Sequence, residues 1–144
     1  MWNAPCTPHR GTPIADEGTK WMDRLAVRKI GGAMGLRLDA FHDLTVERMR
    51  RVNDEVKDAS GVFYACVVAR APTEPHPLLR PTRLFLASRV GDSDGLVPVE
   101  SQVWGEVIGD VRSDHWGVVG WGVSEVPAPE LYASVVRALA ERGH

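Results

Sequence analysis

Two polar side chains have the types and the order of a catalytic acid and base. Asp94 lies in a glycine-rich segment, residues 91–98, and His115 lies further along, in residues 113–117. Each segment follows a run with the composition of a strand, so both side chains are expected on loops. In a Ser-His-Asp triad the imidazole of the histidine transfers a proton, and the carboxylate of the aspartate orients that imidazole. We predict that Asp94 and His115 form this pair; the alternative is that Asp94 only stabilises a turn.

The same segment contains a serine in a G-x-S-x-G pattern. Ser93 has a glycine two positions away on either side, but a nucleophilic serine of this kind must lead into a helix whose first amides stabilise an oxyanion. Pro98 would interrupt such a helix, and the carboxylates of Asp92 and Asp94 would oppose a developing negative charge. We therefore interpret Ser93 as a turn residue, with a role as nucleophile as the less favoured alternative.

The apolar pattern predicts two strands and three longer helices. Residues 62–69 form a β-branched and aromatic run typical of a strand buried on both faces, and residues 107–111 form a second strand. Helices are predicted over 14 to about 30, 46–56 and 128–142, with a short helix at about 100–104. Thr12 and Thr45 are the expected N-caps of the first two. The prolines in residues 70–81 indicate a loop, and residues 84–87 stay unassigned between helix and strand.

The alternation of helices and strands indicates an α/β architecture in a single domain, residues 1–144. A hydrophobic content of 44% is enough for one core. The predicted parallel sheet is narrow, however, and further strands normally cover the apolar edges of such a sheet. The sequence therefore indicates a partial domain, with part of a larger sheet missing.

Three short motifs resemble those of bacterial lipases and carboxylesterases of the α/β-hydrolase superfamily. Residues 93–98 (SDGLVP), with Ser101, and residues 114–116 (DHW) resemble the N-D-G-L-V and D-H loops in the C-terminal part of these enzymes. Residues 7–12 (TPHRGT) resemble the T-P-H-x-G-S turn that follows their nucleophile. The resemblance spans about residues 5 to 122 and is strongest at its two ends.

This resemblance implies the C-terminal half of an α/β-hydrolase, in which a few parallel strands are flanked by helices and the nucleophile half is absent. Asp94 would be the triad acid and His115 the base, while the serine and the oxyanion hole would lie upstream of Met1. Residues 31–60 would occupy the place of a lid. For the helix at 46–56 the alternative is an amphipathic helix packed on the sheet.

Several aromatic residues are candidates for the rim of the site or for a substrate pocket. His9 would line the rim, with a turn-stabilising ring hydrogen bond as the alternative. Trp104, Trp116 and Trp121 would wall an acyl pocket, although a place in the core is favoured for Trp104 and Trp121.

Composition limits the partners. A net charge of −2 and a pI near 6.2 give no basic surface for nucleic acid. No apolar run is long enough to span a membrane, and the first residues lack the features of a signal peptide, so the chain as written is expected in the cytoplasm; this inference lapses if an N-terminal segment is missing. Cys6 and Cys66 are expected to be reduced and partly buried.

Neither a cofactor nor a metal is expected from the sequence. The histidines lack the spacing of zinc ligands. Gly117 stands where several secreted lipases carry a calcium-binding aspartate, two residues after the histidine.

The function expected from these observations is that of a fragment or truncated homologue of a triacylglycerol lipase or carboxylesterase. Such a fragment would be inactive alone, and its relatives would act on esters or acylglycerols. Two alternatives remain. One is a non-catalytic interaction module, or half of a split hydrolase, that binds a partner or a second copy through an exposed sheet edge. The other is a minimal hydrolase that uses Ser93.

Overall fold

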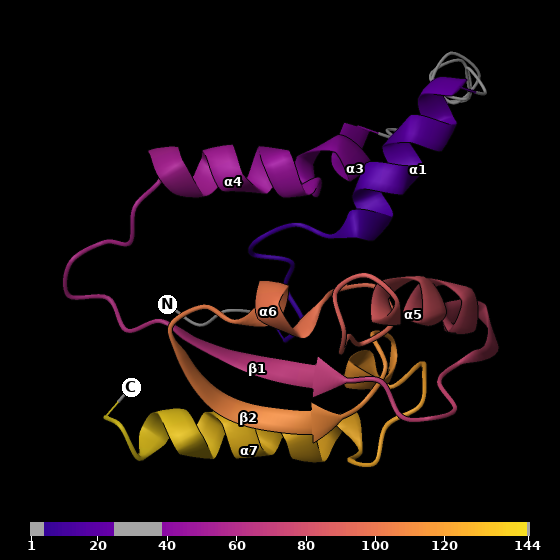
Figure 1. Ribbon diagram of the computed structural model, residues 1–144. Helices are drawn as coiled ribbons and strands as arrows, with labels where there is room; N and C mark the ends of the chain where they lie inside the picture. Colours follow the sequence, from indigo (N-terminus) through magenta and orange to yellow (C-terminus); the bar gives the residue numbers. More distant parts are fainter. Residues whose placement is uncertain (1–4, 25–38, 144) are drawn as a thin grey trace.

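The computed structural model describes residues 5–24 and 39–143, which form two parallel strands with helices on both sides (Figure 1). In chain order the elements are α1 (Pro13–Arg24), α3 (Asp39–Asp43), α4 (Val46–Glu55), β1 (Ala65–Arg70), the 3₁₀-helix η1 (Pro77–Leu79), α5 (Arg80–Ala87), α6 (Val99–Gln102), β2 (Glu106–Arg112), the 3₁₀-helix η2 (Gly117–Val119) and α7 (Ala128–Ala140). This arrangement confirms the predicted α/β class.

The two strands pair in parallel from Ala65 opposite Glu106 to Arg70 opposite Arg112. The first five residues of β1 are buried, as its apolar composition predicts, whereas β2 is partly exposed. The predicted strand starts three residues too early at residue 62. Before β1 the chain makes a turn instead, which the hydroxyl of Tyr64 closes by accepting a hydrogen bond from the amide of Ala59 at 3.0 Å.

The core lies between the sheet and α7. Leu131 and Val135 of α7 pack with Val67 and Ala69 of β1, and Leu139 packs against this cluster. These three α7 residues are the apolar stripe predicted for the last helix, which ends close to the expected position. In Figure 1, α7 runs along the sheet on the side of β2, whereas α5, α6 and the first three helices lie on the other side.

Helix α4 follows its predicted N-cap, because the hydroxyl of Thr45 accepts a hydrogen bond from the amide of Arg48 at 3.4 Å. No residue of α4 is buried, and the helix lies against α1 and α3 rather than on the sheet (Figure 1). The alternative of an amphipathic helix packed on the sheet is therefore wrong. The lid assignment stays a prediction, and part of it, residues 31–38, lies outside the described residues.

Two expectations about proline and tryptophan are also wrong. The segment at 70–81 is not wholly irregular: η1 begins at Pro77, and Pro81 lies in the first turn of α5, which continues through the unassigned residues 84–87. Proline is tolerated in a first turn because its missing N–H has no partner to lose there. Trp121, predicted in the core, is 83% exposed. Trp104 is only partly buried, and its indole N–H donates to Asp58 at 3.0 Å.

Candidate active site

The loops of the predicted acid and base meet at the carboxyl ends of the parallel strands. The amide of Ala71, just after β1, donates to the carbonyl of Ser93 at 2.8 Å, and the amide of His115 donates to the carbonyl of Asp94 at 2.8 Å. The carboxyl ends of parallel strands are where α/β folds place their ligand sites. The backbone alone thus brings Asp94 and His115 together.

The side chains of the pair are in direct contact. Asp94 is fully buried, and its Oδ2 lies 2.8 Å from Nδ1 of His115. Its other oxygen, Oδ1, accepts hydrogen bonds from the amides of Leu96 at 2.9 Å and Val97 at 2.7 Å. Asp94 therefore stabilises its turn with one oxygen and orients the imidazole with the other, so both roles considered from the sequence are compatible.

The contact with Asp94 determines the protonation of His115. Burial lowers the pKa of His115, but the hydrogen bond and charge of Asp94, with the charge of Asp114, outweigh it and leave the pKa above the usual value. A carboxylate at Nδ1 favours the tautomer that carries its proton there. Nε2 is then the nitrogen that can accept a proton from another group.

Replacing Asp94 with asparagine is expected to lower the pKa of His115 and to move its proton to Nε2, because the amide nitrogen would face Nδ1. NMR of the ¹⁵N-labelled imidazole measures both changes. Because the pKa of His115 is raised in the folded chain, protonation of His115 stabilises the fold, and it does so fully at a pH below the ordinary histidine pKa. This contribution to the unfolding free energy is lost as the pH rises through the pKa that His115 has in the folded chain. The difference in unfolding free energy between wild type and variant should therefore shrink as the pH rises. An unchanged pKa would contradict the assignment.

A second buried aspartate organises the His115 loop. Asp114 is fully buried, and its carboxylate accepts four backbone hydrogen bonds. The donors are the amides of His76 (2.8 Å), Trp116 (3.1 Å), Gly117 (2.8 Å) and Val123 (3.0 Å). The chain approaches so closely that a Cβ at Gly122 would collide with this carboxylate. The D-H motif is visible in the sequence, but no local pattern indicates that the carboxylate of Asp114 holds the loop together.

The 7–12 turn is joined to the Asp94 loop by two hydroxyl groups. Ser101 donates to the carbonyl of Gly11 at 2.6 Å and accepts from the amide of Arg10 at 3.1 Å. Thr12 donates to the carbonyl of Leu96 at 2.6 Å and caps α1 by accepting from the amide of residue 14 at 3.3 Å, as predicted. Gly11 has a φ of +76°, and a Cβ there would lie 2.7 Å from the backbone of residue 45. The two motifs that carry the resemblance are therefore in contact.

Gln102 is a buried residue that the sequence did not single out. Its Oε1 accepts from the amide of Ala69 at 2.7 Å, and its Nε2 donates to the carbonyls of Ala69 at 3.0 Å and Val97 at 3.1 Å. The side chain thus bonds to the edge of β1 as a neighbouring strand would, and it fixes the Asp94 loop to that edge. In the sequence, the feature that could indicate this role is the position of Gln102 directly after Ser101 in the predicted short helix.

The Gln102→Leu substitution is expected to destabilise the chain by about 3 kcal/mol, because it leaves the buried N–H and carbonyl of Ala69 without partners and removes one of the two hydrogen bonds of the Val97 carbonyl. Urea unfolding measures the loss. Glu100→Gln is the matched control, since Glu100 is exposed in the same helix. A loss below about 1 kcal/mol would show that the lost bonds are replaced.

The other candidate residues make contacts outside the Asp94–His115 pair. Ser93 is buried, and its hydroxyl accepts from the amide of Gly95 at 3.3 Å within the turn. Trp116 packs edge-on against His76, with ring centroids 4.9 Å apart. The ring of His9 lies 5.6 Å from that of Trp104.

Nε2 of His9 is buried without a hydrogen-bond partner among the described residues. Burial, followed by the charge of Arg10, lowers the pKa of His9. The roles of Ser93, His9 and Trp116 stay predictions.

The cysteines are both free and buried, as expected. Cys6 has a φ of +59°, and its amide donates to the carbonyl of Val67 at 3.3 Å. Burial raises the pKa of its thiol, and the neighbouring Asp94 raises it further. Cys6 therefore lies beside the acid as a neutral thiol, a contact that the spacing of the two residues did not reveal.

An apolar hollow of about 180 Å³ adjoins the pair. Its lining residues are Pro8, Thr12, Ile14, Ala15, Phe41, Leu44, Leu96, Val97 and His115. They come from the 7–12 turn, from α1, from α3 and the residue after it, and from the loops of Asp94 and His115. An imidazole at the wall of an apolar hollow suits a ligand that combines a polar group with an apolar chain.

Comparison with solved structures decides the fold. The crystal structure of the metagenomic carboxyl esterase MGS0156 matches with a TM-score of 0.75 and 20% sequence identity over 96% of this chain and 47% of that chain. The mature lipase BlEst2 of Bacillus licheniformis matches with a TM-score of 0.64 and 17% identity over 94% of this chain and 52% of that chain. The chain has the fold of part of an α/β-hydrolase. It spans about half the length of the hydrolases it matches.

No protein-family model matches the sequence. No curated protein matches it either. Within residues 5–24 and 39–143, no three His, Cys, Asp or Glu side chains gather as a metal site would require. None of the helices in these described residues is long and apolar enough to cross a membrane.

Proposed function

We propose that this chain contributes the acid and the base of a serine hydrolase for carboxylic esters, acylglycerols among them. The serine and the oxyanion hole would come from a segment outside these residues. One observation carries the proposal: fully buried Asp94 bonds to Nδ1 of His115 at the carboxyl ends of the strands of a hydrolase fold. The two solved structures, a carboxyl esterase and a lipase, support esters as the substrate class.

In the proposed mechanism the chain handles the proton. Nε2 of His115 takes the hydroxyl proton of the serine as its oxygen attacks the ester carbonyl, and returns it to the departing alkoxide. A water molecule then attacks the acyl-enzyme, and the same nitrogen carries the proton from water to the serine. Asp94 stays ionised, holds the proton of the neutral ring at Nδ1, and stabilises the imidazolium. The raised pKa of His115 favours this proton uptake.

Incubated alone, the chain is expected to hydrolyse no short-chain nitrophenyl ester and to take up no fluorophosphonate probe. The reason is that the hydroxyl of Ser93 is held in a buried turn and is followed by no helix that could supply oxyanion-binding amides. Mass spectrometry of the treated chain measures labelling, and Ser93→Ala is the matched control. Labelling that disappears in this variant would establish the minimal hydrolase and refute the proposal.

The missing nucleophile can be sought directly by sequencing the DNA upstream of the Met1 codon. A strand followed by G-x-S-x-G, in frame or one frameshift away, would supply the serine, and co-expression with that segment should restore esterase activity. A promoter and ribosome-binding site directly before the Met1 codon, with no such segment, would count against the proposal.

A second candidate function is a docking module, as in a split hydrolase, and one observation favours it. Among the described residues β2 pairs with no strand other than β1, so the outer edge of β2 has no neighbouring strand. Sedimentation of the purified chain over a range of concentrations tests the idea. A concentration-dependent oligomer without fluorophosphonate labelling would favour docking through this edge, and a monomer throughout would exclude self-association.

A lid is predicted for residues 31–60, and we propose that residues 39–55, which contain α3 and α4, form its described part. Phe41 of α3 and Leu44, which follows α3, line the hollow beside His115. Both are more than one-third exposed, so the segment covers the hollow with little burial of its own. A covering segment with few buried contacts is one that can open at low cost.

A further inference from the structure

The hollow beside His115 offers a ligand apolar surface and one imidazole. The polar backbone and hydroxyl groups around it are already bonded. Thr12 donates its hydroxyl to the carbonyl of Leu96 at 2.6 Å and its amide to the carbonyl of Leu44 at 3.0 Å. The amide of Val97 donates to Asp94 at 2.7 Å. Since these groups need no partner from a ligand, the chemistry that fits beyond the imidazole is a hydrocarbon chain.

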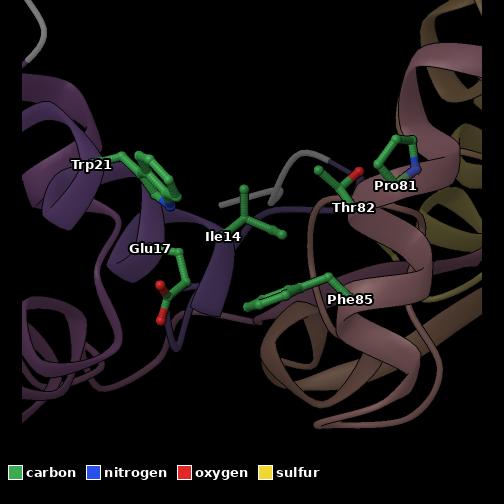
Figure 2. A pocket seen from close by; sticks show the side chains of 7 residues that line it. Ile14, Glu17, Trp21, Pro81, Thr82 and Phe85 are labelled. Atoms are coloured by element: carbon green, nitrogen blue, oxygen red, sulfur yellow. The ribbon is translucent and has the colours of Figure 1, made fainter. Parts of the chain in front are cut away.

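A second apolar hollow, of about 350 Å³, lies between α1 and α5. It is lined by Ile14, Glu17, Gly18, Trp21, Pro81, Thr82 and Phe85. Figure 2 shows the side chain of Ile14 in the middle of this groove, between Trp21 of α1 and Phe85 of α5. Trp21 is 58% exposed, so the outer end of the groove opens to solvent.

Ile14 belongs to both hollows, and it is the residue that the two linings share. It lies in the first turn of α1, directly after Thr12 and Pro13, so its backbone is fixed by the helix N-terminus. Its side chain therefore stands as a partition between the space beside His115 and the groove between α1 and α5.

We propose that the two hollows are successive parts of one acyl-chain channel, and that Ile14 sets the length of the straight acyl group that the site accepts. The inference rests on the proposed function, because it places the ester carbonyl near His115 and the acyl chain in the hollow beside it. The inner hollow of about 180 Å³ holds about six carbons, since a methylene takes up slightly less than the ~30 Å³ of a water molecule in the liquid. Ile14 stops longer chains at this point, so the channel continues into the outer groove only when the side chain at position 14 is smaller.

The test uses straight-chain 2-alkanones with four to about twelve carbons, a series that starts below and ends above the ~six carbons of the inner hollow. These ketones are neutral analogues of the ester and cannot be hydrolysed. NMR titration of the intact chain measures their dissociation constants. In the wild type each added carbon should tighten binding about fourfold until about six carbons are buried, after which the affinity should stay level. We call the chain length at which the affinity stops rising the break. In Ile14→Ala the affinity should continue to rise with chain length beyond the break of the wild type.

Two variants keep the result unambiguous. Leu84→Ala is the matched control, because Leu84 of α5 is 66% exposed and lines neither hollow, so the break should stay where it is in the wild type. Should Ile14→Ala not fold, Ile14→Val removes a single methyl group and should move the break by about one carbon. A break at the same length in both Ile14 variants, or no break in the wild type, would overturn the proposal.

The titration breaks no bond, so its outcome is separate from that of the acid–base proposal. An affinity independent of chain length would refute the channel and leave the raised pKa of His115 intact. Conversely, failure of the Asp94→Asn test on the pKa of His115 would refute the pair and leave the length series valid. The outcomes of the two proposals can therefore be told apart.

Discussion

In a hydrolase assembled with its serine, Asp94→Asn is expected to lower kcat about 10⁴-fold, with little change in KM. The asparagine carbonyl can still accept the amides of Leu96 and Val97, which Oδ1 of Asp94 binds at 2.9 and 2.7 Å, so the turn is kept. Its amide nitrogen would face Nδ1 of His115. The ring would then carry its proton on Nε2, where it cannot accept the proton of the serine.

The measurement is the steady-state hydrolysis of a nitrophenyl ester by the assembled enzyme. Asp92→Asn is the matched control, because Asp92 lies in the same loop and its side chain is 75% exposed in an ion pair with Arg70. Ion pairs as exposed as this contribute little, so kcat should be unchanged in the control. A fall of less than about tenfold in Asp94→Asn would show that this carboxylate does not orient the base.

The largest loss of stability is expected for Asp114→Ala, at about 3 to 5 kcal/mol. The carboxylate of Asp114 is buried and accepts four backbone amides. Alanine removes the acceptor of the amides of His76, Trp116 and Val123, whereas the amide of Gly117 keeps its bond to the carbonyl of residue 114 at 3.0 Å. Domains of this size are stable by about 5 to 15 kcal/mol in total. The variant is therefore expected to be close to unfolding.

Urea unfolding followed by circular dichroism measures this loss. Asp114→Asn keeps one acceptor oxygen and should lie between the wild type and the alanine variant. Asp92→Ala removes an exposed aspartate and should cost about 1 kcal/mol or less. Equal losses in Asp114→Ala and Asp92→Ala would mean that the four bonds are replaced, by water or by rearrangement of the loop.

The parts of the fold that the sequence predicted are those that a local pattern encodes. The β-branched run before residue 70 and the stripe of Leu131, Val135 and Leu139 predicted β1 and α7, because a buried strand and an amphipathic helix have their own periodicities. The contact between Asp94 and His115 followed from the placement of their loops after successive parallel strands. The match to solved hydrolases over about half of their chains agrees with the predicted partial fold.

The parts that the sequence did not predict depend on contacts between distant segments. Trp121 was expected in the core, but it follows Gly120, whose φ of +84° turns the chain in an irregular loop where no periodicity says which way a side chain faces. The prolines in residues 70–81 predict a loop, although Pro77 begins η1 and Pro81 lies in the first turn of α5. Gln102 bonds to Ala69 and Asp114 bonds to His76 across more than thirty positions, so no local pattern records these contacts.

The amide of Gln102 also determines how far any neighbouring strand can run along β1. Because this side chain occupies both the N–H and the carbonyl of Ala69, backbone pairing on that edge must stop at Val67, where the amide of Cys6 is bonded. The positive φ of Cys6 then turns the chain away. Pairing on this edge thus ends next to Asp94, since the thiol of Cys6 lies beside this carboxylate. The segment that borders β1 therefore leaves the sheet before β1 itself ends at Arg70.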